Sequence, residues 1–120
     1  PARVPLWWFD GRDIIGQSSK GPVGDQFTAA LMGVGVTARE VVSVHTFYLA
    51  AALVRCGASV AVVDEPTALT LRDDAVAIRP LDPPLRFSIC ALHLEDRPLS
   101  KLAESFLSVL RECLAEALRP

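Results

Sequence analysis

The sequence has no long apolar run and few cysteines. Both shortages limit the cellular compartments in which we expect the protein. Its longest apolar run, residues 47–54, stops at Arg55, far short of the roughly 20 residues that cross a bilayer. No basic leader followed by an apolar stretch and a small-residue cleavage site opens the chain. The three cysteines, Cys56, Cys90 and Cys113, are widely spaced and odd in number, which favours free thiols in a reducing compartment. We therefore expect a cytoplasmic protein that does not span a membrane.

An excess of positive charge is also missing. The chain has 12 Lys and Arg residues against 14 Asp and Glu residues, a net charge of −2, and no basic cluster. Proteins that bind phosphate backbones carry a basic patch or stripe. We expect no nucleic-acid binding by this chain itself.

Metal and nucleotide motifs are absent or incomplete. His45 and His93 are far apart, and no two cysteines have the spacing of a zinc site. Residues 11–18, GRDIIGQS, have the glycine spacing of a phosphate-binding P-loop, but Gln17 replaces the lysine that reaches the phosphates. The residues after it, 18–22, continue as loop where a P-loop would already be helix. We expect neither a metal nor a cofactor.

What the sequence does contain is a strand, helix, strand pattern between Glu40 and Glu65. The β-branched runs 41–44 and 60–63 suit strands covered on both faces and paired as neighbours in a parallel sheet. Residues 47–54 between them are apolar nearly all round, which predicts a buried helix, and Gly57 is placed to end it in a left-handed conformation. This is a βαβ crossover, and 120 residues suit one domain.

The flanking segments predict further elements. Residues 4–9 read as a strand that puts Trp7 and Trp8 on opposite sides, with a turn after it. From Pro22 a helix with one apolar face should run to the glycines at 33 and 35. A short helix should start near Pro66, capped by the acidic residues before it. Residues 76–78 read as a strand, and the prolines from 80 to 84 as a connector.

The end of the chain predicts a strand and a long helix. Residues 85–94 alternate imperfectly and read as a strand buried on both sides. The longest amphipathic helix follows, and its apolar stripe needs a partner. The stripe consists of Leu99, Leu102, Phe106, Leu110, Cys113, Leu114 and Ala117.

Together these elements predict an α/β fold, a three-layer α-β-α arrangement around a mostly parallel sheet, followed by the C-terminal strand and long helix. In open α/β sheets, ligands bind beyond the carboxyl ends of the strands, here the loops at residues 43–46 and 64–67. We also expect the turn after the first strand to approach this crevice, where an arginine could pair with an acidic ligand. The candidate binding residues are Ser43, His45, Thr46, Asp64, Thr67 and Arg12.

Each candidate also has a plainer interpretation. His45 and Thr46 begin the central helix, where backbone N–H groups favour an anion such as a carboxylate. Equally, His45 could be satisfied by backbone while Ser43 or Thr46 only caps the helix, and Arg12 could belong to an exposed turn. Ser43, His45 and Asp64 have the residue types of a hydrolase triad, but no nucleophile-elbow sequence surrounds the serine. We therefore expect no catalytic residues.

Over nearly its whole length the chain resembles the C-terminal half of the effector-binding domain of LysR-type transcriptional regulators. The resemblance depends on residues 52–57, ALVRCG, leading into 60–64, VAVVD, on Arg79-Pro80-Leu81, and on the closing helix at 100–110 with Phe106. Residues 64–67, DEPT, are similar to the corresponding segment in the regulators of octopine and nopaline use. Those regulators sense amino-acid-like compounds. Two departures stand out. Ser59 replaces a second glycine, and the winged helix-turn-helix and first lobe are missing.

The resemblance implies one lobe of a periplasmic-binding-protein-like fold that holds a small effector in an interlobe cleft. Residues 1–84 would form the second lobe, and residues 85–120 the return strand and helix that cross into the first lobe. It also implies a homodimer or larger homo-oligomer, DNA contacts through the missing winged helix, and no enzymatic activity. The alternatives are a small α/β hydrolase or transferase, and an oligomerisation fragment without a ligand.

Overall fold

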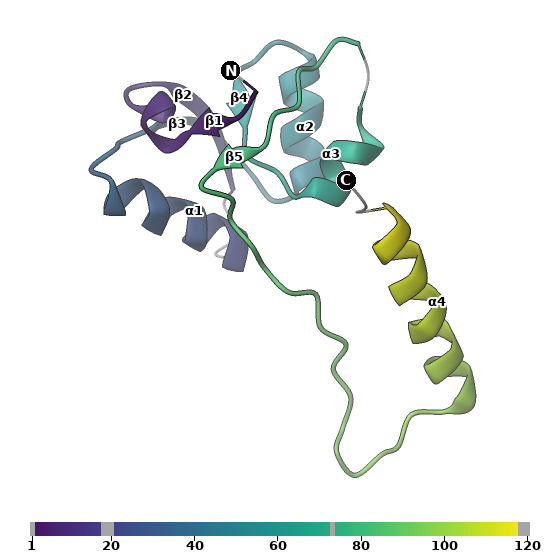
Figure 1. Ribbon diagram of the computed structural model, residues 1–120. Coiled ribbons are helices and arrows are strands. Elements are labelled where there is room, and N and C mark those ends of the chain that lie inside the picture. The colour runs from purple at the N-terminus through teal and green to yellow at the C-terminus, as the bar shows by residue number, and fades with distance from the viewer. Residues whose placement is uncertain (1, 18–20, 73, 118–120) are drawn as a thin grey trace. The chain divides into compact units, whose positions relative to one another are not determined.

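The computed structural model describes residues 2–17, 21–72 and 74–117 of the chain. It divides into two compact units, the first ending at Phe87 and the second beginning at Ser88, and each is described by itself. The first unit carries five strands, three α-helices and a short 3-10 helix among its described residues (Figure 1). In chain order these are β1 (Val4–Pro5), η1 (Leu6–Phe9), β2 (Asp13–Gln17), α1 (Pro22–Gly33), β3 (Arg39–Val44), α2 (Phe47–Arg55), β4 (Val60–Ala61), α3 (Glu65–Thr70) and β5 (Leu81–Asp82).

The main sheet has three parallel strands in the order β3-β2-β4. Asp13 pairs with Arg39 at one end of the β2–β3 ladder and Gln17 with Val44 at the other. The expectation that the strands around 41–44 and 60–63 are neighbours is wrong, because β2 lies between them. β2 itself was not predicted as a strand. It forms because a ladder on each side satisfies its backbone groups, although only Ile14 and Ile15 give it an apolar signal.

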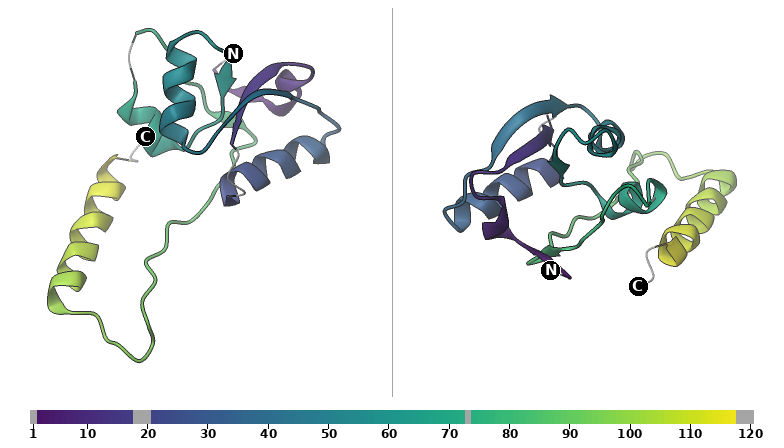
Figure 2. Two further views of the ribbon diagram at one scale, coloured as in Figure 1. Left: turned by 180° about the vertical axis from the view of Figure 1, so that it is seen from behind. Right: turned by 90° about the horizontal axis from the view of Figure 1, so that it is seen from above.

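The two faces of the sheet are covered by different helices. Ile14 packs with the core that contains Phe27 and Leu31 of α1, whereas Ile15 packs with Val44 of β3 and Ala50 of α2. Successive residues of a strand point to opposite faces, so α1 and α2 lie on opposite sides of the sheet, as Figure 2 also shows. The predicted α/β class with parallel strands between helices is confirmed.

The start of the chain differs from the prediction. The strand expected over residues 4–9 ends at Pro5, and η1 replaces the rest. Residues three apart eclipse one another in a 3-10 helix, so Leu6 and Phe9 are buried together while Trp7 is 69% exposed. The strand expected at residues 76–78 is also wrong. The partner of β1 is β5, with Val4 opposite Leu81 in parallel register.

The observed ends of the helices match the predictions better than the observed burial of the helices does. α1 runs from Pro22 to Gly33 as predicted, and α3 has Asp64 as its N-cap. Gly57 ends α2 with φ of +77°, and the N–H of Ala58 donates to the carbonyl of Leu53 at 3.1 Å, a Schellman arrangement. The expectation that α2 is buried all round is wrong, since Tyr48 is 64% exposed.

Two further burial expectations are also wrong. Val41 and Val42 in β3 are exposed because β3 is an edge strand of the sheet. Val34 lies between the two glycines at which the apolar-faced helix from Pro22 was expected to end, and it is exposed as well. It follows the last residue of α1 as its C-cap, so it no longer continues that face.

The second unit contains α4 (Lys101–Ala117), the long amphipathic helix that the sequence predicts. Ser100 caps it by accepting a hydrogen bond from the N–H of Ala103 at 3.2 Å. The strand expected at residues 85–94 is wrong. That segment has no regular structure and residues 88–94 are exposed, since no described strand of the unit supplies a ladder. Along α4, Leu102 is 81% exposed.

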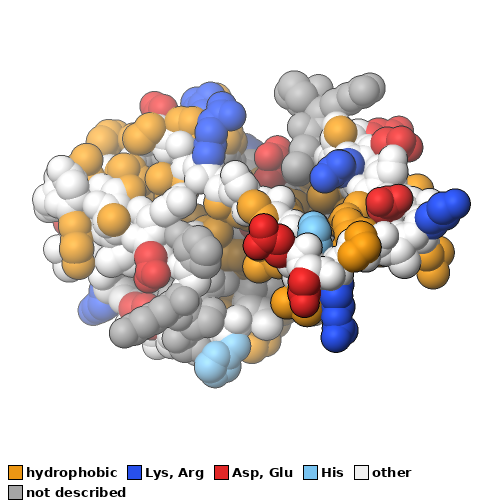
Figure 3. Space-filling model, turned by 90° about the horizontal axis from the view of Figure 1, so that it is seen from below, with side chains coloured by type: hydrophobic (Ala, Val, Ile, Leu, Met, Phe, Trp, Pro, Cys, Tyr) orange, Lys and Arg blue, Asp and Glu red, His pale blue; other side chains and the backbone are white. Residues whose placement is uncertain are grey.

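Many hydrophobic side chains are exposed to solvent, as the orange atoms of Figure 3 show for one face. The exposed ones include Met32 of α1, Val41 of β3 and Phe106 of α4. None of the helices in the described part of the chain has the length and apolarity needed to cross a membrane.

Candidate functional site

The carboxyl edge of the main sheet brings together residues that are far apart in the sequence. β2, β3 and β4 are parallel, so their last residues, Gln17, Val44 and Ala61, point to the same edge. The chain then enters α2 from β3 and α3 from the segment after β4. Two helix starts, each with backbone N–H groups that lack a helical partner, therefore follow this edge.

Both helix starts are capped by side chains. The Thr46 hydroxyl accepts a hydrogen bond from the N–H of Leu49 at 3.2 Å. Asp64 Oδ1 accepts from the N–H of Thr67 at 2.6 Å. One N–H group in each first turn is thereby satisfied, so the capping role foreseen for Thr46 is present. The remaining N–H groups and the positive end of the α2 dipole still favour an anion.

The other candidates lie in the same region, with one exception. Ser43 sits opposite Gly16 in the β2–β3 ladder, His45 lies between β3 and α2, and Thr67 is in the first turn of α3. Ser43 and His45 are exposed, and Thr67 is half-buried. Their shared position follows directly from the parallel strand order.

Arg12 is the exception, and the expectation that it approaches the crevice is wrong. It precedes Asp13, the first residue of β2, and so lies at the amino edge of the sheet. Its Nε donates to the Trp8 carbonyl at 2.7 Å, and its Cζ lies 4.1 Å from the centre of the Trp8 ring. The prediction treated residues 4–9 as the strand that leads into the crevice, but β2 is that strand.

A pocket of about 120 Å³ lies on the same edge, among residues of β2, the first turns of α1, β3 and the start of α2. Sequence reasoning missed it, because it depends on β2 being a strand. Its lining combines apolar side chains with two carboxylates. The lining residues are Ile14, Ile15, Gly16, Gln17, Val23, Gly24, Asp25, Phe27, Thr28, Glu40, Phe47 and Val62.

Gly16 is the signal that could have revealed this pocket. A Cβ added at Gly16 would overlap the side chain of Glu40, which lies across the glycine. A glycine inside a strand marks a place where another group approaches the backbone closely. The sequence shows Gly16 plainly, but its partner is set by strand pairing and cannot be read from the chain order.

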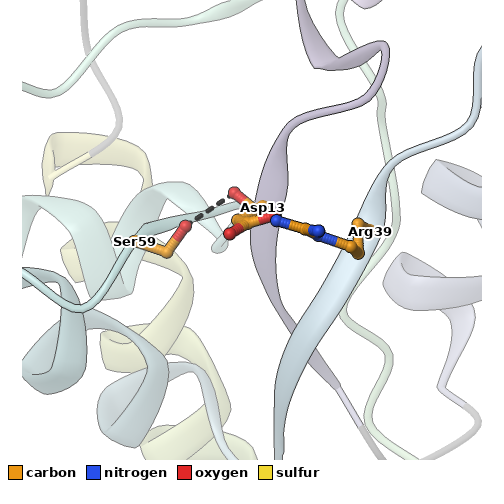
Figure 4. A network of polar contacts seen from close by, with 3 residues as sticks. All are labelled: Asp13, Arg39 and Ser59. Carbon is orange, nitrogen blue, oxygen red and sulfur yellow. Dashed lines mark hydrogen bonds and ion pairs between the residues drawn. The ribbon is translucent and has the colours of Figure 1, made fainter.

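The amino edge of the sheet is held by a polar network of three residues (Figure 4). Arg39 forms an ion pair with Asp13, and the Ser59 hydroxyl donates to the Asp13 carbonyl at 2.6 Å. The hydrogen bond from Arg39 holds the pKa of the Asp13 carboxyl below its usual value, against a smaller opposing effect of burial. Ser59, the residue before β4, thus links the start of β4 to β2.

Metal-binding geometry is absent from the part of the chain that the structure describes. No three His, Cys, Asp or Glu side chains there are grouped so that they could hold an ion. Cys56, Cys90 and Cys113 are free and exposed.

Comparison with known proteins adds the family to this geometry. The family model of the LysR substrate binding domain matches residues 9–115. The HTH-type transcriptional regulator DgcR of Pseudoalteromonas sp is 33% identical over 114 residues. That alignment covers 95% of this chain and 39% of the relative, so the chain spans about two fifths of the length of this curated regulator. No solved structure matches the chain.

Proposed function

The chain belongs to the family of LysR substrate-binding domains, and from that premise we propose that it binds a small, amino-acid-like effector for a bacterial transcriptional regulator. The family and the relative are regulatory, and the chain is a ligand-sensing domain, not an enzyme. The alternative of a small α/β hydrolase or transferase is therefore set aside. In the proposal, effector binding in a cleft between two lobes changes how the regulator occupies DNA.

The observation that carries the proposal is the strand order β3-β2-β4 with all strands parallel. It puts the starts of α2 and α3 at one edge, where ligands bind in sheets of this kind. A carboxylate of the effector would lie against the first turn of α2. The proposed binding residues are Ser43, His45, Thr46, Asp64 and Thr67.

We keep the predicted division of the chain as part of the proposal. Residues 1–84 would be the second lobe, and residues 85–120 a strand and helix that complete the first. Two observations support this. The compact units divide between Phe87 and Ser88, close to that boundary, and the second unit holds an extended exposed segment followed by an amphipathic helix. Both have apolar surface that another lobe could cover.

The partners follow from the same proposal. The regulator would work in the cytoplasm as a homodimer or larger homo-oligomer, and its DNA contacts would come from a winged helix rather than from this chain. The net charge of −2 agrees with the last point. The exposed residues of α4, such as Leu102 and Phe106, favour a role in assembly as a second, compatible function.

A metabolite screen tests the proposal. Amino acids, their condensed derivatives and matched neutral compounds would be added to the regulator that carries this chain. The thermal midpoint of unfolding would be measured with each compound, and each hit would then be studied by calorimetry. We expect a saturable, one-to-one complex with at least one amino-acid-like compound, which is recovered chemically unchanged. Turnover of the hit, or stabilisation only by unrelated compounds, would contradict the proposal.

A further inference from the structure

The carboxylate of Glu40 lies over Gly16 of β2, near the edge of the sheet where the effector is proposed to bind. The β2–β3 ladder pairs Ile14 with Glu40 and Ile15 with Val42, so Val41 is an extra residue in β3. Glu40, paired with Ile14 just before this bulge, lies on the same face of the sheet as Ile14 and Gly16. Its side chain then reaches Gly16, the only residue type that leaves room for it there.

The described residues that line the pocket around this carboxylate carry negative charge. Among its described lining residues, Glu40 and Asp25 are charged and none is Lys, Arg or His. Asp25 is in the first turn of α1, where the positive end of the helix dipole stabilises it. Glu40 has no hydrogen-bond or ion-pair partner among the residues that the structure describes. The neighbouring cation, Arg39, is occupied by Asp13.

The rest of the lining is apolar and suits the methylene groups of a ligand. Phe27 and Val62 line the pocket together with Phe47, the first residue of α2. Pockets that enclose a whole small-molecule ligand have volumes of about 300–1,000 Å³, so the pocket of about 120 Å³ has room for one head group and not for a whole metabolite. The remainder of a ligand held there would extend along the edge toward Thr46.

We propose that Glu40 binds a cationic nitrogen of the effector, an ammonium or a guanidinium group, in the pocket over Gly16. The inference rests on the proposed function and names the chemical class of its ligand. A charge-assisted hydrogen bond to a carboxylate is the strong polar contact that such a pocket offers. With a carboxylate at the start of α2, the effector is a zwitterion whose two charges lie on either side of Phe47. Dicarboxylates are repelled by Glu40 and Asp25.

The test uses methylguanidinium as the probe and neutral methylurea of nearly the same shape as its control. Each is titrated into the full chain while the backbone amide signals are followed by NMR. We expect methylguanidinium to shift the Gly16 and Gly24 signals saturably and methylurea to shift neither. Glu40→Gln should weaken the binding of methylguanidinium at least about tenfold, the loss expected for one hydrogen bond to a charged group.

A matched variant and the metabolite screen separate the possible outcomes. Glu112→Gln, on exposed α4, should leave the titration unchanged, and an equal loss in both variants would mean unspecific charge attraction and overturn the site. Equal binding of methylguanidinium to wild type and Glu40→Gln also overturns it. If amino-acid-like hits bind Glu40→Gln normally, the Glu40 assignment fails while the proposed function stands. If methylguanidinium binds at Gly16 but no metabolite binds anywhere, the proposed function fails instead.

Discussion

Arg39 donates from its Nε to Oδ1 of Asp13 at 2.5 Å, joining the first residue of β3 to the first residue of β2. These two residues are also paired in the ladder, so the ion pair supports the register at the amino edge. One strand further on, Ser59 donates to the Asp13 carbonyl. The carboxyl edge of the main sheet lies at the other end of the same strands. The residues that stabilise the sheet are therefore separate from the residues proposed to bind the effector.

This ion pair predicts a pH dependence of stability. The folded pKa of Asp13 lies below its ordinary value of 3.8 because Arg39 hydrogen-bonds to the ionised form. The resulting stabilisation is present above the unfolded pKa and is lost as the pH falls through the folded pKa. Asp13→Asn should therefore destabilise the chain at pH 7 and flatten the fall in its unfolding free energy below about pH 4. Urea unfolding at several pH values measures this, with Asp96→Asn as the control. Parallel curves for wild type and Asp13→Asn would refute the prediction.

The glycines at the ends of α1 and α2 should respond differently to replacement by alanine. Gly57 has φ of +77°, so Gly57→Ala should cost about 1–2 kcal/mol, the penalty of a left-handed residue with a Cβ. Gly33 closes α1 without a positive φ, and a Cβ there meets nothing within 4 Å. Gly33→Ala should be neutral or stabilise by up to about 1 kcal/mol. Chemical unfolding of both variants checks the pair, and a larger loss at Gly33 would refute the assignment of the caps.

The Thr46 cap predicts a graded response. Thr46→Ala removes the hydroxyl that accepts from the Leu49 N–H and should cost about 1 kcal/mol of unfolding free energy. Thr46→Ser keeps an acceptor at the same place and should cost much less. Urea unfolding followed by circular dichroism measures both. Equal stability of the alanine and serine variants would show that the hydrogen bond contributes nothing.

The exposed apolar residues of α4 predict self-association of the chain. Leu102, Phe106 and Leu110 are all more than a third exposed, and contiguous apolar surface of this kind favours assembly. Replacing all three by serine should lower the mass measured by light scattering at high protein concentration. A control that replaces Lys101 and Arg111 by serine should leave the mass as in wild type. An unchanged mass in the triple variant would show that these residues of α4 take no part in self-association.

Local signals in the sequence were sufficient for the helices. α1 runs from Pro22 to Gly33, Asp64 caps the start of α3, and Gly57 ends α2. These ends could be predicted because caps and glycines act through the few residues around them. The same chemistry placed Thr46 at the start of α2. The family, too, could be identified from short motifs spread along the chain.

Strand pairing was harder to predict, because it joins distant residues. β2 has five residues, of which only Ile14 and Ile15 gave an apolar signal, and missing it made β3 and β4 look adjacent. The same omission put Arg12 at the wrong edge and hid the approach of Glu40 to Gly16. Residues 85–94 show the reverse error, since an alternating pattern forms a strand only where another strand supplies the ladder.

The claim that the edge after β3 binds the effector is tested most directly in the regulator that carries this chain. A dose–response of reporter expression against the effector found in the screen would compare wild type with the double variant His45→Ala, Thr46→Ser, whose serine keeps the α2 cap. His93→Ala, in the exposed segment of the second unit, serves as the control. The account predicts that the double variant needs at least about ten times more effector for half-maximal response, with an unchanged circular dichroism spectrum. A response curve identical to wild type would contradict it.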